Sequence, residues 1–427
     1  MSSDVDVCVV GGGLAGIAAG LAARAEGASV VVLEGSSHAG GKARTSDGLE
    51  HGPQSFNGRY DVFWQLLEQL GLTATAERVG PASSTRWLAR FGRLHALKPS
   101  PLTLFGTRAL TAREKLSLVR DATLGGPVAP AATLHDFFAQ RFGASFAEGP
   151  LAAMVNGIFA GDPRELGVDG CFPGLAQRAV EKQSVVKALL AAGAPSARKG
   201  IYRLAGGMGA IGAAARQKLE IELEAPVREL TRDDSGFWVR GGRDLHARAV
   251  VVATEAHVAA KLLWPLSPKL GAALGQLTYA PITVVHWEGD DARFGGGFGY
   301  LACPSERLFA LGTMFHGNRF STFVSGAVAD DATLAAGIAA DVRRLTGGSV
   351  GRVLRIDRWP NAVFQPTVAA LPVRDGLAAL AGEAGVLLAG SYLGASAMKD
   401  ALASGFAAGQ QAWELSQRKP QWSRSLS

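Results

Sequence analysis

Cysteine is scarce in this sequence, whose 427 residues include only Cys8, Cys171 and Cys303. The three lie far apart and form no C-x-x-C pair, which argues against a disulfide framework and against a zinc site. We therefore predict no metal site, and the cysteine usage favours a reducing, cytoplasmic compartment.

Long apolar runs are also lacking. The uncharged stretch 7–23 contains five glycines, and it falls short of the ~20 apolar residues that span a bilayer. Asp4 and Asp6 interrupt the start of the chain, and no basic region precedes the apolar residues. We expect neither a transmembrane helix nor a secretory signal.

Charge is modest and unevenly spread. Charged residues make up 19% and apolar residues 48%, an ordinary globular balance, and 427 residues are enough for two or three domains with substantial cores. The formal net charge is +6, and residues 86–120 carry eight basic residues against one acid, Glu114, among leucines and prolines. This mixture suits an anionic membrane surface, with an ordinary solvated basic face as the alternative. No helix-turn-helix, zinc-finger or RNA-binding signature accompanies the charge, so we expect no nucleic-acid partner.

Glycine, by contrast, is abundant at 55 residues, and its most informative cluster lies near the start. The apolar run Val7–Val10 enters a G-x-G-x-x-G segment, a helix-forming stretch follows, and a second β-branched run ends in an acid. This order predicts a strand–turn–helix that binds a dinucleotide. The pyrophosphate would lie at the helix N-terminus and the acid would bind the ribose. The predicted residues are Gly11, Gly12, Gly13, Leu14, Ala15, Gly16 and Glu34.

A second group of residues indicates which dinucleotide is bound. Another glycine pair with a basic residue follows within one loop and would add donors and a cation for the pyrophosphate. An NAD site would not need them, so FAD is preferred. The arrangement resembles the FAD-binding start of the amine oxidase-like flavoproteins, which include monoamine oxidases, polyene desaturases and protoporphyrinogen oxidases. The further residues predicted to bind FAD are Gly40, Gly41, Lys42, Gly52, Pro53, Gln54 and Ser55.

The remaining pattern predicts an α/β fold with a discontinuous Rossmann-type domain. We expect helices over 61–72, 111–124, 133–142, 147–158, 177–192 and 402–413, with strands near 221–223, 227–230, 237–239, 250–254, 283–286, 309–315 and 386–390. The predicted FAD-binding domain comprises 1–60, 200–260 and 380–427. A mixed-sheet substrate domain comprises 61–90 and 261–379, and a helical domain, the one expected to contact a membrane, comprises 91–199. The predicted fold is monoamine oxidase-like.

One segment narrows the resemblance within these flavoproteins. Residues 156–168 read NGIFAGDPRELGV, which closely resembles the G-[IV]-[YF]-A-G-D-P-x-x-L-S-V segment of protoporphyrinogen oxidases. Supporting matches extend over nearly the whole chain, among them Arg86-Trp87 followed by Gly92-Arg93-Leu94, and Arg358-Trp359-Pro360.

The resemblance implies a flavoenzyme of haem biosynthesis that oxidises protoporphyrinogen IX to protoporphyrin IX. Hydride would pass from a meso methylene to flavin N5, with O₂ as the electron acceptor. The cofactor carries the difficult step, so we predict no catalytic side chain. The resemblance also suggests a homodimer.

The resemblance also assigns residues. Arg86 matches an arginine expected to pair with a substrate propionate, Gly161 would bring backbone close to a pyrrole, and Met314 and Phe323 match apolar substrate positions. Ala302 stands where the family usually has leucine, which would widen the pocket. Further positions expected to contact the flavin are Val227, Trp359, Gly390, Ala397, Met398 and Lys399.

Departures from the family pattern keep other functions open. Residues 392–402 are one residue longer than the family's Y-x-G-V-G-x-N-D-C-I, and they lack its asparagine and cysteine. Coproporphyrinogen III, oxidised to coproporphyrin III, is therefore an alternative substrate. An amine oxidase or polyene desaturase is a second alternative, and a non-catalytic flavin- or porphyrin-binding protein is a third.

Overall fold

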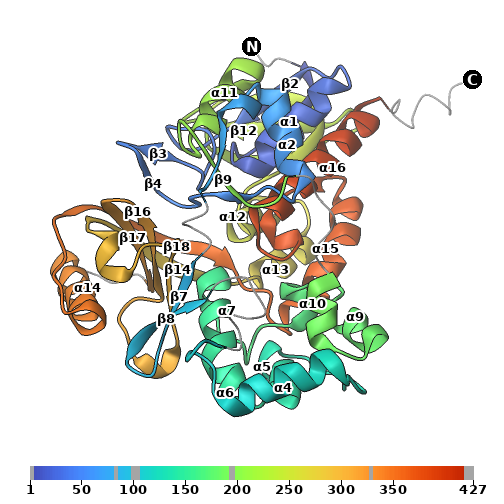
Figure 1. Cartoon of the computed structure of the whole chain (residues 1–427). Coiled ribbons are helices and arrows are strands. Elements are labelled where there is room, and N and C mark those ends of the chain that lie inside the picture. Colours follow the sequence, from blue (N-terminus) through green and yellow to red (C-terminus); the bar gives the residue numbers. More distant parts are fainter. Residues whose placement is uncertain (1–3, 81–84, 98–105, 192–197, 327–329, 418–427) are drawn as a thin grey trace, which may run out of the picture. The chain divides into compact units, whose positions relative to one another are not determined.

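The computed structural model describes residues 4–80, 85–97, 106–191, 198–326 and 330–417 (Figure 1). It divides into two compact units. Unit 1 comprises Met1–Arg78, Ser196–Thr278 and Ala369–Ser427, and unit 2 comprises Val79–Pro195 and Tyr279–Val368. Each unit is described by itself below.

Unit 1 is built on a sheet with the strand order β10-β2-β1-β13-β12-β11, in which β19 also pairs with β13. The strands β10, β2, β1, β13 and β19 run parallel, whereas β12 and β11 are antiparallel. The bounds are β1 Asp4–Val10, β2 Val30–Leu33, β10 Glu220–Glu222, β11 Val227–Arg232, β12 Phe237–Gly241, β13 Leu245–Val252 and β19 Leu387–Leu388. Apart from the edge strand β10, the parallel strands are mostly apolar and buried, as expected of a sheet covered on both faces.

Helices and two small sheets complete unit 1. The helices are α1 Leu14–Ala25, α2 Asp61–Leu70, α11 Ala210–Lys218, α12 Ala256–Leu263, α13 Pro268–Gly275, α15 Ala370–Ala384 and α16 Met398–Ser416, with 3₁₀ turns at Thr73–Thr75 and Ser391–Leu393. The small sheets pair β3 Thr45–Ser46 with β4 Leu49–Glu50, and β9 Ile201–Leu204 with β5 Phe56–Asn57 and β6 Ala76–Arg78.

The C-terminal helix α16 lies along α1, the first helix of the chain (Figure 1). Gly405 and Gly409 make the contact, because a Cβ on either would overlap a backbone carbonyl of α1, at Ala15 and Ala19 respectively. The four-residue spacing puts both glycines on one helix face. Helix α16 is thereby packed against the helix that follows the predicted dinucleotide turn.

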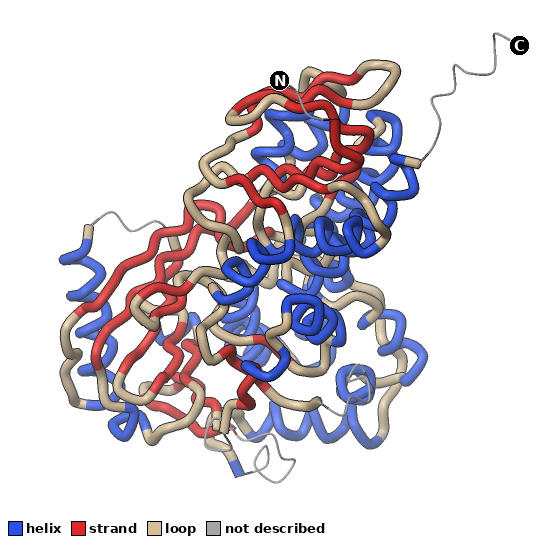
Figure 2. The backbone as a smooth tube through the Cα atoms, turned by 90° about the horizontal axis from the view of Figure 1, so that it is seen from above, coloured by secondary structure: helices blue, strands red, loops and turns tan. Residues whose placement is uncertain are grey.

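Unit 2 contains a twisted sheet with the order β18-β14-β17-β16-β15-β7-β8 (Figure 2). Its strands are β7 Arg86–Arg90, β8 Arg93–Leu97, β14 Tyr279–Glu288, β15 Gly299–Ala302, β16 Gly312–His316, β17 Arg319–Ser325 and β18 Val353–Phe364. One face packs on α14 (Asp331–Thr346) through Leu334, Ile338 and Val342. Short 3₁₀ turns lie at Asp291–Phe294 and Pro304–Glu306.

The helical part of unit 2 has a core of its own, rich in phenylalanine. Its elements are α4 Ala112–Thr123, α5 Leu134–Phe142, α6 Ala144–Phe146, a π turn at Ala147–Leu151, α7 Ala152–Phe159, α8 Val168–Cys171, α9 Leu175–Lys182 and α10 Val185–Ala191. In the described part of the chain, we find no helix with the length and apolar character needed to cross a bilayer.

Two helix boundaries differ from the sequence prediction. The helix expected over 177–192 is two helices, because Gln183 adopts a left-handed conformation at φ 50° and the Ser184 hydroxyl accepts the backbone N–H of Lys187. The helix expected to begin at Leu402 begins at Met398, because the Asp400 carboxylate accepts the N–H of Ala397 at 3.0 Å.

A buried ion pair joins the sheet of unit 2 to its helices. Arg90, the last residue of β7, donates two hydrogen bonds of 2.8 Å to Glu114 of α4, and both side chains are almost fully buried. Burial by itself raises the pKa of Glu114, but hydrogen bonds from Arg90, the Ser145 hydroxyl and the Thr111 N–H outweigh it and lower the pKa to about 2. The strand that carries Arg86 is thus anchored to the helical part.

We predict that Gly409→Val destabilises unit 1 by about 1–3 kcal/mol, because its side chain would force α1 and α16 apart. Urea unfolding measures the loss. Gly376→Ala is the matched control, since it lies in α15 with nothing within 4 Å of an added Cβ and should be neutral or slightly stabilising. Equal unfolding midpoints for the Gly409 variant and the parent would contradict the packing described here.

Glu114→Gln should lower the free energy of unfolding by about 3–5 kcal/mol at neutral pH, because Arg90 would stay buried without a counter-charge. The folded-state pKa lies below the ordinary value of 4.5, so the Glu114 contribution is present above that pH and is lost as the pH falls toward 2. Urea unfolding across this range should therefore show a flatter pH dependence in the variant. Glu288→Gln, which removes an exposed pair with Arg352, is the control and should cost less than about 1 kcal/mol.

Candidate active site

The predicted dinucleotide turn lies at the carboxyl end of β1. Gly11 has φ 104°, and its N–H donates to the Leu33 carbonyl at 2.8 Å. A Cβ on Gly16 would overlap the Gly11 carbonyl oxygen, so only glycine lets α1 start this close to the strand. Gly13 differs, because nothing lies within 4 Å of its added Cβ. The open space beside Gly13, at the N-terminus of α1, is where a pyrophosphate would fit.

The acid at the end of β2 is held in place by backbone donors. Glu34 accepts the Gly12 N–H at 2.6 Å through one carboxylate oxygen and the Ser36 N–H at 2.8 Å through the other. The carboxylate is half-buried, which leaves oxygen lone pairs available to ribose hydroxyls.

The second glycine pair packs against the first. The Gly40 N–H donates to the Gly12 carbonyl at 2.8 Å, and Gly13 and Gly40 form an isolated bridge. Lys42, expected to face the pyrophosphate, forms an ion pair of 2.5 Å with Glu255, which follows β13. The turn Gly52–Ser55 packs beside Lys42, where a Cβ on Gly52 would meet the Lys42 carbonyl. Both loops therefore belong to one cradle.

The C-terminal residues reach the same edge of the sheet. β1, β13 and β19 are in parallel register, with Val10 opposite Val252 and Val252 opposite Leu388. Gly390 therefore follows its strand at the edge where Gly11 follows β1, and ligands bind at this edge in such sheets. Gly390 donates its N–H to the Ser404 hydroxyl of α16 at 3.0 Å.

The start of α16 is also ordered by hydrogen bonds. Ala397 precedes the helix, Met398 and Lys399 form its first turn, and the Lys399 ammonium lies 2.5 Å from the Asp400 carboxylate. Val227 begins β11 of the same unit, whereas Trp359 lies on β18 of unit 2. Unit 1 thus contains every predicted cofactor residue except Trp359.

The predicted substrate residues all lie in unit 2. Strand pairing places Arg86, Met314 and His286 in one row across the sheet, together with Gly299, Ser321 and Arg355. Phe323 is two residues from Ser321 along β17 and shares its face. Met314 and Phe323 are half-buried and Arg86 is exposed. Three of the five predicted substrate residues therefore share the face opposite α14.

Ala302 requires a correction. It lies in the core beneath α14 with Tyr300, on the opposite face from Arg86 and Met314, because it stands three positions after Gly299 on β15, an odd number. It cannot widen a pocket on the Arg86 face. Leu301 is the β15 side chain on that face, where it packs against Gly157 of α7.

Phe298 is a second residue that the sequence prediction missed, although it stands in the same GFGYL segment. The Arg86 guanidinium lies over its ring, 4.9 Å from the centroid. This stacking orients the guanidinium while leaving its N–H donors available to an anion.

Gly161 follows α7, whose last turn ends at Ala160 with φ 51°. A Cβ on Gly161 would overlap the side-chain oxygen of Gln365, which donates its amide to the Phe159 carbonyl at 2.7 Å. A close packing contact inside unit 2 therefore accounts for this glycine, and its approach to a pyrrole stays a prediction.

A buried polar network on the Arg86 face was also missed. The His286 Nδ1 lies 3.0 Å from the Ser321 hydroxyl, and its Nε2 lies 3.6 Å from the Asp357 carboxylate. Arg355 donates to both oxygens of that carboxylate, at 2.9 and 3.0 Å. These residues are far apart in sequence, so only the strand register could have brought them together.

The cysteines supply no nucleophile. Burial raises the pKa of Cys8, Cys171 and Cys303 to about 12 each, so each is a neutral thiol at neutral pH. Within the described ranges, no group of three histidine, cysteine or acidic residues is placed to hold a metal ion.

Comparison with known proteins agrees with this geometry. Residues 14–412 match the family described as flavin containing amine oxidoreductase. The chain belongs to that family and is an FAD-dependent oxidoreductase. It is 30% identical over 351 residues to a protoporphyrinogen oxidase of Bos taurus, covering 72% of each chain. Within the family, it therefore belongs with the protoporphyrinogen oxidases.

Other similarities extend the comparison. A coproporphyrinogen III oxidase of Propionibacterium freudenreichii subsp. freudenreichii is 29% identical over 340 residues, which is 66% of this chain and 63% of that protein. A solved Exiguobacterium sp. 255-15 structure, provisionally named a protoporphyrinogen oxidase, gives a TM-score of 0.81 at 20% identity and covers 97% and 99% of the two chains. Cyclohexylamine oxidase from Brevibacterium oxydans IH-35A gives a TM-score of 0.70 at 18% sequence identity. The match covers 97% of this chain and 100% of that chain. The fold is thus monoamine oxidase-like.

Gly13→Val should fold but lose FAD, because its side chain would occupy the open space in the cradle, where nothing in the protein lies within 4 Å of the added Cβ. Gly16→Ala should lose both stability and FAD, because its Cβ would overlap the Gly11 carbonyl. Flavin absorbance per protein and the urea midpoint of the flavin-free forms separate the two effects. A Gly13 variant that purifies with full FAD would contradict the placement of the pyrophosphate.

Proposed function

We propose that the chain oxidises a porphyrinogen to the corresponding porphyrin, with O₂ as the electron acceptor. Protoporphyrinogen IX is the preferred substrate and coproporphyrinogen III the alternative. One observation supports the proposal above all. The same chain contains an FAD cradle and the segment Gly157–Pro163, which resembles the corresponding segment of protoporphyrinogen oxidases. The names of the bovine and bacterial relatives support both substrates.

FAD, when bound, supplies the acceptor for hydride from a meso methylene of the porphyrinogen. The chain's own residues supply binding and orientation. Gly13 and the N-terminus of α1 hold the pyrophosphate, and Glu34 holds the ribose. Arg86, oriented by Phe298, pairs with a propionate, while Leu301, Met314 and Phe323 present an apolar surface to the macrocycle. An apolar surface also keeps water from the reacting carbon.

The direct test is to mix the purified flavoprotein in air with each porphyrinogen and to follow porphyrin fluorescence. Formation of porphyrin faster than in the protein-free blank, with O₂ consumed, supports the proposal, and the ratio of the two rates identifies the substrate. If neither is oxidised, turnover of an amine or a carotenoid would favour the second alternative. Bound porphyrin without O₂ consumption would favour a non-catalytic binding protein.

Arg86→Ala should raise the KM for the preferred porphyrinogen about tenfold or more and leave kcat nearly unchanged, because one charge-assisted pair with a propionate is lost. Arg86→Lys should recover part of the loss, since an ammonium keeps the charge but not the planar fork. Arg352→Ala, an exposed arginine of the same unit, is the control. Equal KM values for the parent and all the variants would show that Arg86 does not bind the substrate.

We also propose that the helical part of unit 2 contacts an anionic membrane surface. Arg113, Leu116, Arg120 and Leu124 follow one face of α4, and the two leucines are 69% and 78% exposed. Leu190 of α10, which packs against α4, is 76% exposed. Exposed leucines beside arginines suit a bilayer interface with acidic headgroups. Lys98, also part of the basic segment, lies outside the described residues.

Charge reversal tests this contact. Arg113→Glu with Arg120→Glu should lower binding to vesicles of phosphatidylcholine and phosphatidylglycerol by about tenfold or more, at about 1 kcal/mol per lost basic residue. Arg216→Glu with Lys261→Glu, on exposed positions of unit 1, matches the change in net charge. Equal loss in both double variants would indicate a general charge effect and would overturn the assignment to α4.

A cytoplasmic location, which the cysteine usage favours, and a homodimer, which the family resemblance suggests, complete the proposal. Light scattering of the eluted flavoprotein measures the oligomer directly. A mass of one chain would contradict the dimer without affecting the proposed chemistry.

A further inference from the structure

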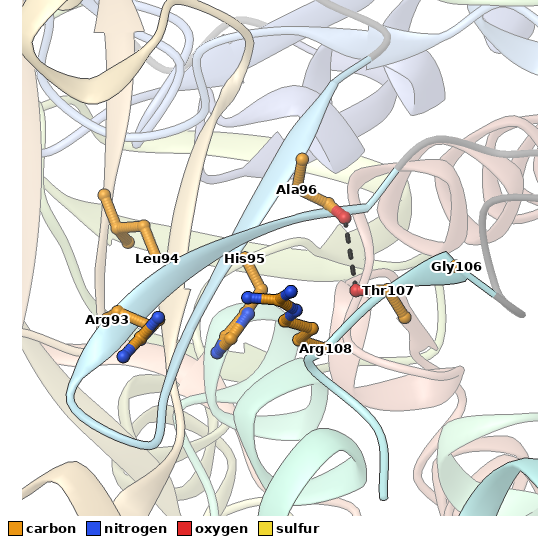
Figure 3. Close-up of a pocket in the computed structure, with 7 residues that line it drawn as sticks. All are labelled: Arg93, Leu94, His95, Ala96, Gly106, Thr107 and Arg108. Atoms are coloured by element: carbon orange, nitrogen blue, oxygen red, sulfur yellow. Dashed lines mark hydrogen bonds between the residues drawn. The ribbon is translucent and has the colours of Figure 1, made fainter. Parts of the chain in front are cut away.

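A cavity of about 420 Å³ that is open to solvent lies at the edge strand β8 of unit 2, which pairs with β7, the strand that carries Arg86. None of the residues that line it is a predicted cofactor or substrate residue. Its wall is formed by Arg93, Leu94, His95 and Ala96 of β8 and by Gly106, Thr107 and Arg108. Figure 3 shows these two segments side by side, with Arg93, His95 and Arg108 presented to the same space.

One hydrogen bond joins the two segments, and two more order the residues beside it. The Thr107 hydroxyl donates to the Ala96 carbonyl at 3.4 Å and accepts the Ala109 N–H at 3.1 Å. The His95 Nε2 lies 2.9 Å from the Arg90 carbonyl. Since a carbonyl only accepts, Nε2 carries a proton and the imidazole is fixed in orientation.

The cavity carries unbalanced positive charge. The nearby buried acids are already paired, Glu114 with Arg90 and Glu306 with Arg344. The guanidinium groups of Arg93 and Arg108 form no hydrogen bond or ion pair with the part of the chain that the structure describes. Two guanidinium groups at one cavity repel each other, and a bound anion would relieve that repulsion.

We propose that this cavity binds a phosphate monoester group, presented either by an anionic lipid headgroup or by a small soluble phosphate. A carboxylate is satisfied by one bidentate guanidinium, whereas a phosphate offers three oxygens and can engage both Arg93 and Arg108. The cavity volume falls within the usual range for small-molecule sites, so it accommodates more than the phosphate itself. The proposal is independent of the flavin chemistry.

The flavoprotein is titrated calorimetrically with inorganic phosphate, with glycerol 3-phosphate and with acetate, and is sedimented with phosphatidylcholine vesicles with and without phosphatidic acid. Arg93→Gln and Arg108→Gln should each weaken phosphate binding about tenfold, the loss of one charge-assisted interaction. Arg216→Gln is the control. Unfolding midpoints within error of the parent show that the variants are folded.

Binding of glycerol 3-phosphate that both variants weaken supports a soluble ligand. Binding confined to vesicles that contain phosphatidic acid, weakened in the same way, supports a lipid headgroup. Acetate bound as tightly as phosphate would overturn the assignment to phosphate. The site would be overturned if inorganic phosphate, glycerol 3-phosphate and phosphatidic acid vesicles all fail to bind, or if both variants retain in full the binding that the parent shows.

Discussion

The close approach of Gly16 to the Gly11 carbonyl is the contact on which the function of unit 1 depends. It allows α1 to start directly after β1, so that the helix N-terminus and the open space at Gly13 face the same ligand. The other parts of the cradle are arranged around that turn. Glu34 binds the Gly12 N–H, Gly40 binds the Gly12 carbonyl, and α16 packs on α1 through Gly405 and Gly409. An added methyl group at Gly16 would disturb all of them.

Unit 2 depends on a different interaction. The buried pair of Arg90 and Glu114 joins the strand that carries Arg86 to the helical part. Removing both charges from water costs free energy. The hydrogen bonds that Arg90 and Glu114 form with each other, with Ser145 and with Thr111 offset that cost. The position of Arg86 beside Phe298 is therefore fixed from both ends, by strand pairing with β15 and by the ion pair at the end of β7.

Local signals in the sequence were enough to predict the FAD cradle. Its strand, turn and helix are adjacent in sequence, Gly11 and Gly16 answer local steric needs, and Gly13 leaves open space beside the helix N-terminus, so the spacing specifies the geometry of the turn. Arg86, Met314 and Phe323 were predicted as substrate residues from family resemblance. The strand register places the three on one face of the sheet, and their contact with a substrate stays a prediction. The strand register contradicts the prediction that Ala302 widens the substrate pocket, because a shift of one residue moves a side chain to the other face of the sheet. The division of the chain into three domains stays a prediction.

Features that depend on distant contacts could not be predicted in this way. The break at Gln183 leaves the Ser184 hydroxyl bound to Asp121 of α4, a partner 63 residues away. His286, Ser321 and Asp357 come from three strands, and no local pattern marks them. Phe298 could have been found from the sequence, since it lies in a segment already matched to the family, but its stacking on Arg86 requires the sheet.

The central claim is that FAD held in this cradle takes electrons from a porphyrinogen. Mixing the flavoprotein anaerobically with protoporphyrinogen IX or coproporphyrinogen III, and recording the absorbance of oxidised flavin, tests it most directly. The account predicts that one of the two bleaches the flavin as porphyrin forms, and that the absorbance returns when O₂ is admitted. A flavin that stays oxidised with both porphyrinogens would contradict it.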